Sequence, residues 1–196
     1  FDFVWFLTQS QEFMATTVLR TLRENADSPY ILKEVFDFVW FLIAKLEFYR
    51  DFFTDDNIAP ALIDAINDHL EYAPLVKSAC SVMWSHSSHK DNKTAIAEYG
   101  GIHALVMAVL AHVDKPSLQK EAMIAIKNIA TNSRNKTQFR KQGGEQALLL
   151  SMQANYDSPP VLDTAFSALN NIIVDIELRT VQRIDPEAFQ CLLKGM

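Results

Sequence analysis

The chain has 196 residues, of which 49% are hydrophobic, with only 5 Gly and 7 Pro, so it can bury a core and is not disordered. Its formal net charge of −6 weighs against nucleic-acid binding, which usually needs a basic face. Two cysteines, Cys80 and Cys191, lie too far apart in the sequence pattern to suggest a designed bridge, which indicates a reducing compartment. The longest apolar run, residues 35–44, is too short to span a bilayer.

Apolar residues at three- and four-residue spacings predict helices along the whole chain. Residues 1–10 read as the end of one helix and residues 11–26 as a second, which Asp27-Ser28-Pro29 terminates. Proline recurs before each later long helix. The pattern predicts long helices at 30–49, 75–89, 117–132 and 160–176, shorter ones before them at 11–26, 58–71, 102–113 and 145–155, and small ones at 92–99 and 135–142.

The stretch 98–132 recurs 43 residues later, which is typical of stacked helical repeats. The matching pairs are Gly100-Gly101 with Gly143-Gly144, Ala122 with Ala165, Asn128 with Asn171, and Pro116 with Pro159. Residues 1–7 also recur letter for letter at 36–42, an offset of 35 that leaves open a shortened repeat or a local duplication. The chain opens on Phe rather than Met, so we expect a fragment of a longer chain.

Three helices per unit, a Gly-Gly corner and an Ala-x-x-Ala-φ-x-Asn-φ pattern in the third helix resemble the armadillo repeat. The resemblance rests on residues 92–132 and 135–175, with weaker copies before and after. It implies an all-α, right-handed superhelical solenoid of about four repeats, at 11–53, 54–91, 92–134 and 135–176, in one domain over 1–196 with partial repeats at both ends. The HEAT-like α-α superhelix is the alternative fold, and the glycine corners weigh against it.

The family holds extended peptides along a concave groove, where an Asn on each third helix clamps the peptide backbone. The resemblance assigns this role to Asn128 and Asn171, with Ser85 and Phe41 at the earlier positions. An amide suits the role because it offers a donor and an acceptor together. Residues expected on the same groove are Lys120, Glu121, Ile124, Thr131, Asp163, Thr164, Ser167, Lys77, Ser78 and Ser81.

Lysine recurs at one equivalent position, as Lys33, Lys77 and Lys120, and Asp163 ends the series. One interpretation is a row of ammonium groups that selects an acidic peptide. The other is a set of solvated first-turn lysines with no ligand. The nuclear-import branch of the family pairs each groove Asn with a Trp four residues earlier, and this sequence lacks that array.

Phenylalanine is concentrated near the start, with ten of 13 within residues 1–53. Phe36, Phe38, Trp40, Phe52 and Phe53 cannot all face one narrow core stripe. They either pack against a neighbouring repeat or form an exposed apolar interface for a partner or a second copy.

Catalytic and metal chemistry is not indicated. Cys80, His86 and His89 lack an evident fourth ligand, so we expect no metal and no cofactor. Asn92 and Asn135 begin glycosylation-like triplets, and we interpret both as caps of the short helices that follow.

The sequence therefore predicts a non-enzymatic scaffold or adaptor that binds an extended peptide or helix of a partner protein, in the cytoplasm or also in the nucleus or a larger complex. One alternative is a structural or anchoring adaptor in a cytoskeletal, ciliary or membrane-associated complex that uses the aromatic N-terminal end. Another is a regulatory domain of a larger signalling protein or enzyme. The oligomeric state is left open.

Overall fold

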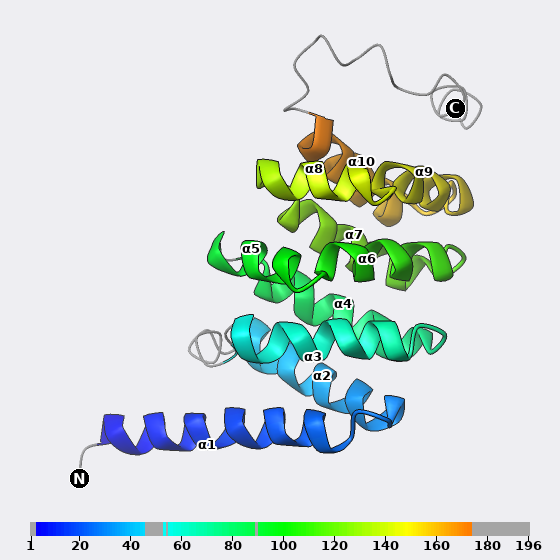
Figure 1. The fold of residues 1–196 in the computed structure, drawn as a ribbon. Coiled ribbons are helices and arrows are strands. Elements are labelled where there is room, and N and C mark those ends of the chain that lie inside the picture. The colour runs from blue at the N-terminus through cyan, green and yellow to red at the C-terminus, as the bar shows by residue number, and fades with distance from the viewer. Residues whose placement is uncertain (1–2, 46–52, 54, 89, 174–196) are drawn as a thin grey trace.

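The computed structural model describes residues 3–45, 53, 55–88 and 90–173, and every regular element within these ranges is an α-helix. The helices rise in chain order from α1 at one end to α10 at the other, as Figure 1 shows. Their bounds are α1 Phe3–Glu24, α2 Pro29–Lys45, α3 Asp55–Asp68, α4 Ala73–His86, α5 Lys90–Glu98, α6 Gly101–Ala111, α7 Pro116–Ile129, α8 Ser133–Lys141, α9 Gly144–Ala154 and α10 Pro159–Ile173.

Proline starts α2, α4, α7 and α10. We call these four the long helices, after their predicted lengths, and keep α1 outside this name. Proline is the first residue of α2, α7 and α10 and the second residue of α4. Proline suits this place because the first backbone N–H groups of a helix have no partner within the helix. The predicted starts of these helices agree with the structure to within two residues, and the predicted helical residues 46–49, 89 and 174–176 lie outside the described residues.

Two glycine pairs turn the chain between the short helices and the helices that follow them. Gly100 and Gly143 cap α6 and α9 with φ of 96° and 77°, a left-handed conformation that favours glycine. The second glycine of each pair is needed for close packing. A Cβ on Gly101 would meet the Ile96 side chain and lie 2.7 Å from its carbonyl oxygen, and a Cβ on Gly144 would overlap the Phe139 ring.

The first helix differs from the sequence prediction. Residues 3–24 form one continuous helix, whereas the sequence analysis divided them into the end of one helix and the start of another. No Pro or Gly interrupts this stretch, so nothing in it ends a helix before residue 24.

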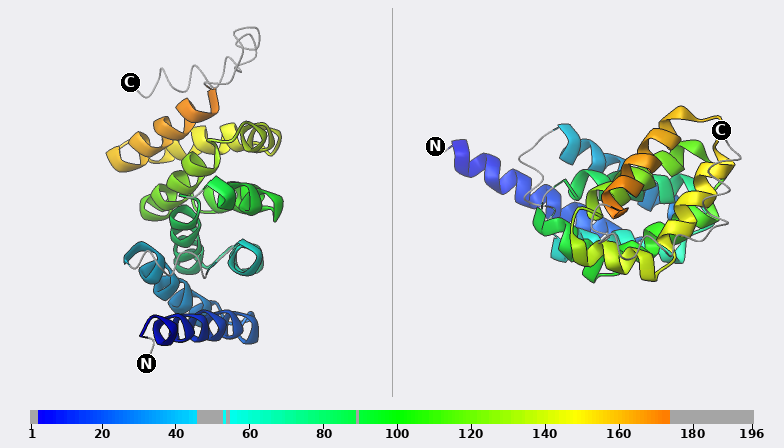
Figure 2. Two further views of the ribbon diagram at one scale, coloured as in Figure 1. Left: turned by 90° about the vertical axis from the view of Figure 1, so that its left-hand side faces the viewer. Right: turned by 90° about the horizontal axis from the view of Figure 1, so that it is seen from above.

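The long helices form the spine of the structure. The most extensive contacts between elements join α2 to α4, α4 to α7, and α7 to α10, and Figures 1 and 2 show these helices stacked one above the next. One continuous apolar core follows them from Ala15 to Ile172. Within the described residues no single helix is long and apolar enough to cross a membrane; residues 92–98 and 101–111 reach that length only as a pair, bent by 74°.

Candidate functional site

The expected lysine row lies on the first turns of the long helices, but its three members are not alike. Lys77 and Lys120 are exposed and make no hydrogen bond or ion pair with the described residues. Lys33 Nζ instead lies 2.8 Å from Asp37 Oδ2 and 2.9 Å from Glu34 Oε1. Hydrogen bonds to Asp37 and then Glu34 raise the pKa of Lys33 above its ordinary value. Of these three lysines, only Lys77 and Lys120 are therefore free of an internal ion pair and can pair with an acidic ligand.

The two asparagines join neighbouring long helices. Asn128 on α7 donates Nδ2–H to the Trp84 carbonyl oxygen of α4 at 3.1 Å, and Asn171 on α10 donates to the Lys127 carbonyl oxygen of α7 at 3.0 Å. We call this pair the amide row. Both side chains are half-buried, and their Oδ1 atoms have no hydrogen-bond partner within the described part of the chain. One N–H group of each amide thus joins two neighbouring long helices, while the side-chain carbonyl oxygen is not used by the described residues.

The earlier positions of this row differ from expectation. Ser85 is 6% exposed, so it is part of the interior and not of an open surface. Phe41 stands at the corresponding place on α2 and is 49% exposed. Small hydroxyl side chains pack easily between helices, which explains why Ser85 is buried where Asn128 is not.

The other residues expected on this surface differ in how much of each side chain is exposed to solvent. Glu121, Ile124, Ser81 and Ser167 are half-buried, and Asp163 and Thr131 are exposed. Thr131 Oγ1 donates to the Asn128 carbonyl oxygen at 2.8 Å and accepts a hydrogen bond from Lys93 Nζ at 2.9 Å.

Two expected members of the surface face inward. Ser78 is buried and donates to Asp37 Oδ1 at 2.5 Å, and Thr164 is buried and donates to the Pro160 carbonyl oxygen at 2.8 Å. They belong to the contacts between and within long helices, so a ligand cannot reach them.

We use layer for one of the long helices together with the shorter helices that precede it. A second set of side-chain hydrogen bonds joins successive layers, and the sequence did not predict it. His69 and His112 each place Nε2 at 2.7 Å from a carbonyl oxygen of the preceding layer, of Ala26 and Leu70 respectively. Asn155 donates Nδ2–H to the Val113 carbonyl oxygen at 2.7 Å. We call His69, His112 and Asn155 the corner row. Because the acceptor is a carbonyl oxygen, each histidine must carry its proton on Nε2. Their 43-residue spacing was the available signal.

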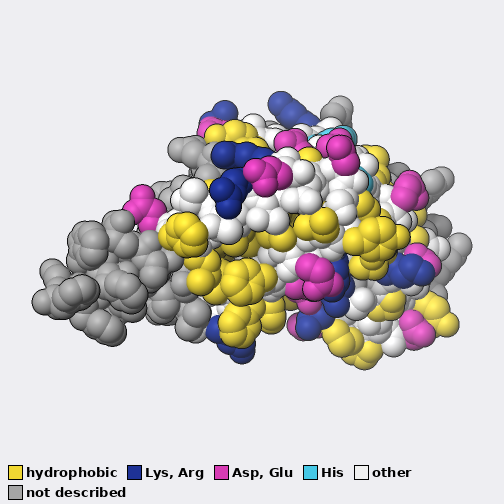
Figure 3. Space-filling model, turned by 90° about the horizontal axis from the view of Figure 1, so that it is seen from below, with side chains coloured by type: hydrophobic (Ala, Val, Ile, Leu, Met, Phe, Trp, Pro, Cys, Tyr) yellow, Lys and Arg dark blue, Asp and Glu magenta, His cyan; other side chains and the backbone are white. Residues whose placement is uncertain are grey.

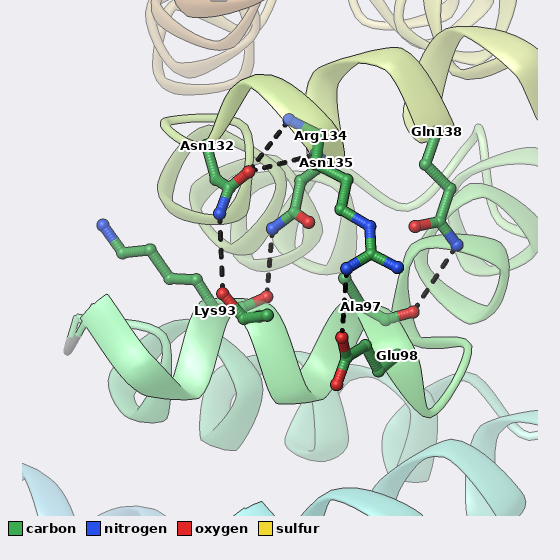
Figure 4. A network of polar contacts seen from close by, with 8 residues as sticks. Lys93, Ala97, Glu98, Asn132, Arg134, Asn135 and Gln138 are labelled. Carbon is green, nitrogen blue, oxygen red and sulfur yellow. Dashed lines mark hydrogen bonds and ion pairs between the residues drawn. The ribbon is translucent and has the colours of Figure 1, made fainter.

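Polar contacts also join α5 to α8, as Figure 4 shows. Asn135 is 1% exposed and donates Nδ2–H to the Lys93 carbonyl oxygen at 3.0 Å and to that of Ile129 at 3.2 Å. The residue that caps α8 is Asn132, whose side chain accepts from the N–H groups of Arg134 and Asn135. The expectation that Asn135 is the cap is therefore wrong, because its amide is used inside the fold.

At the α1 end, the aromatic residues divide between the core and the surface. Phe36 and Phe53 are fully buried, so neither forms part of an exposed interface; Trp40 is partly buried, and Phe52 lies outside the described residues. The exposed residues form a set that we call the end patch: Phe13 at 74%, Tyr30 at 68%, Ile31 at 40%, Phe38 at 43% and Phe41 at 49%. Figure 3 views this end and shows hydrophobic side chains gathered across it.

The residues considered for metal binding are mostly inaccessible. Cys80 and His86 are fully buried, and His89 lies outside the described residues. Burial, with a smaller effect of the Glu121 charge, raises the pKa of the Cys80 thiol to about 12. Within the ranges that the structure describes, no group of three or more His, Cys, Asp or Glu residues could hold a metal ion.

Comparison of the chain with family models, with curated proteins and with solved structures found no match in any of the three. A functional interpretation of this protein is therefore built on the arrangement of its own residues.

Proposed function

We propose that this chain is a protein-binding scaffold of the armadillo class, built as a right-handed superhelix of about four three-helix repeats. An extended segment of a partner protein would lie across α4, α7 and α10. The observation that carries this proposal is the amide row. Asn128 and Asn171 are half-buried, one N–H group of each bonds to the preceding long helix, and the side-chain carbonyl oxygen has no hydrogen-bond partner among the described residues.

The fixed N–H group orients each amide before a ligand arrives. Its Oδ1 atom can then accept from a peptide N–H, and its second N–H can donate to a peptide carbonyl oxygen. Because the side chain is already ordered, binding loses less conformational entropy than it would with a freely rotating amide. Packed helices lie about 10 Å apart, and an extended chain rises about 3.3 Å per residue. Successive amides would thus hold peptide groups about three residues apart.

The charge of the exposed lysines would determine which peptides bind most tightly. Lys77 and Lys120 lie on neighbouring long helices and are exposed without an ion pair among the described residues. They favour acidic side chains in the ligand, although Asp163 on α10 opposes this at the far end. Lys33 contributes little because Glu34 and Asp37 neutralise it.

We assign no catalytic role to this site. Its chemistry consists of hydrogen bonding and charge, and it needs no cofactor. The buried free thiol of Cys80 is compatible with the reducing conditions of the cytoplasm or nucleus, where we place the protein.

A charge-reversal experiment tests the proposal. The probes are two fluorescently labelled extended peptides of equal length, one rich in Glu and one rich in Lys, and the readout is fluorescence anisotropy. We expect the wild-type chain to prefer the acidic probe, and the double variant Lys77→Glu/Lys120→Glu to weaken its binding at least about tenfold. Lys141→Glu, an exposed lysine on α8, is the matched control and should change binding less than about twofold.

The same variants test the native ligand. Partners captured by the wild type and the Lys141→Glu control, but lost from the double variant, would support the proposal. Equal binding of both probes, or equal loss in the double variant and the control, would overturn it.

A further inference from the structure

Two residues of the end patch, Ile31 and Phe38, occupy positions that are buried in the later helices α4, α7 and α10. The backbone hydrogen bonds of the first turns align α2 with α4 at an offset of 44, and α4 with α7 and α7 with α10 at 43; the bond from Leu32 N to Ser28 O matches that from Val76 N to Tyr72 O. By this alignment Ile31, Val35, Phe38 and Phe41 on α2 correspond to Leu75, Ala79, Val82 and Ser85 on α4. All four α4 residues are buried.

That face of each later long helix meets the long helix before it. Ser78 on α4 bonds to Asp37 on α2, Asn128 on α7 bonds to α4, and Asn171 on α10 bonds to α7. On α2 the same face has no stacked counterpart of these helices before it among the described residues; α1 lies beside it and leaves a hollow. Its apolar residues Ile31, Phe38 and Phe41 are therefore exposed within the described part of the chain.

The size of the side chains excludes one occupant. Where α4, α7 and α10 approach the helix before them they carry small residues, with Ala79, Ala122 and Ala165 at one position and Val82, Ala125 and Ala168 at the next. The corresponding residues of α2 are Val35 and Phe38. A helix that stacked on α2 as the internal helices stack, such as α10 of a second copy with its exposed Phe166, would meet Val35 where the internal contacts have alanine and Phe38 where they have valine or alanine.

The end patch has the two features that a self-complementary contact needs. Beside its protruding rings lies a hollow of about 490 Å³ between α1 and α2, lined by Thr17, Val18, Thr21, Tyr30, Ile31, Glu34, Val35 and Phe38. Glu34 is the only charged residue in this lining and is paired with Lys33. The two threonine hydroxyls already donate to the carbonyl oxygens of Phe13 and Thr17. The two threonines can thus be buried without leaving their hydroxyl donors unpaired.

The exposed rings lie close enough to act together. Tyr30, Glu34, Phe38 and Phe41 follow one another at spacings of three and four residues, so they share one side of α2. Phe13 precedes Thr17 by one turn of α1 and lies on the side that lines the hollow.

The area suits a weak, concentration-dependent contact. If a free aromatic side chain presents about 200 Å², the exposures of Phe13, Tyr30, Phe38 and Phe41 amount to roughly 470 Å² in each copy. Two copies would bury about 940 Å² through these rings alone, which is below the roughly 1,200–2,000 Å² of stable interfaces and typical of transient ones.

We propose that a second copy of this chain covers the end patch, in a two-fold symmetric dimer in which the α1–α2 ends face each other. Rings of each copy enter the hollow of its partner copy. A two-fold contact uses the same surface on both copies and closes at two, whereas a contact between opposite ends of the stack would continue into longer chains.

Sedimentation velocity on the 196-residue chain tests this directly, from roughly 1 µM to about 1 mM. We expect the mass to reach twice that of the monomer and to stop there. Phe38→Glu should raise the dimer dissociation constant at least about tenfold. Phe166→Glu is the matched control because Phe166 is an equally exposed aromatic residue at the opposite end, at 53% against 43%, and it should change the constant less than about twofold.

Far-UV circular dichroism shows whether each variant is folded, and Tyr30→Glu, at a second exposed ring, replaces Phe38→Glu if that variant unfolds. A monomer at every concentration would overturn the proposal and leave the end patch to another protein. A mass that rises beyond twice the monomer, or a dimer that Phe166→Glu disrupts and Phe38→Glu does not, would overturn it as well.

Discussion

Removing the amide row should lower the stability of the stack by a predictable amount. Asn128→Ala and Asn171→Ala each delete one hydrogen bond from a side chain to the carbonyl oxygen of the preceding long helix. A bond of this kind contributes about 1 kcal/mol net. The two bonds join different pairs of helices, so their effects should add to about 2 kcal/mol in the double variant. With a urea m-value of about 2 kcal/mol/M, the midpoint should fall by about 1 M.

Urea unfolding followed by far-UV circular dichroism measures this loss. Lys127→Ala is the matched control: it shortens a side chain on the same surface but keeps the carbonyl oxygen that accepts from Asn171, so its stability should change by less than about 0.5 kcal/mol. If the asparagine variants are as stable as this control, the amide row does not hold the long helices together. Any loss of ligand binding in the same variants must be judged against this measured change.

Two further outcomes follow from buried groups. Gln119 donates to two carbonyl oxygens, at 3.0 and 2.7 Å, and accepts from Ser151 Oγ at 2.5 Å, so Gln119→Leu should cost about 3 kcal/mol in urea unfolding and Ser151→Ala about 1 kcal/mol. Strictly additive costs in the double variant would contradict a direct bond between them. Burial raises the pKa of the Cys80 thiol from its ordinary 9.0 to about 12 in the folded state. The thiol therefore ionises first in the unfolded state, so the unfolding free energy falls as the pH rises from 9.0 toward 12. Cys80→Ala should therefore flatten the fall in unfolding free energy across that range, and an unchanged slope would contradict this.

The helices could be predicted from the sequence because their signals are local. Proline at a first turn and glycine at a corner act through the conformation of a few neighbouring residues. Pro116 and Gly143 illustrate this, since each stands where the pattern placed it. The predicted division of residues 3–24 into two helices is wrong, because this stretch contains no Pro or Gly that would end a helix.

The burial of individual residues could not be predicted in the same way, because it depends on which layers lie above and below. Phe36 and Phe38 are two residues apart in one duplicated segment, yet one is fully buried and the other is 43% exposed. The difference arises because Phe36 faces the core shared with α4, while Phe38 faces the side on which α2 has no preceding long helix among the described residues. Asn135 is not the cap of α8 for a similar reason, since the carbonyl oxygens that its amide reaches belong to other helices.

The recurrence of a polar residue at a fixed spacing has a structural explanation that must be considered before a functional one. The corner row and the amide row both bond to carbonyl oxygens 42 to 44 residues earlier in the chain, and both kinds of bond occur together where α6–α7 and α9–α10 meet the helices before them. Two separated bonds oppose both sliding and rotation of one layer on the next, so they set the distance between successive long helices. Any peptide that spans Lys77 and Lys120 must match that distance. The internal bonds of the amide row would therefore contribute to ligand selection even where the ligand touches only the remaining carbonyl oxygens.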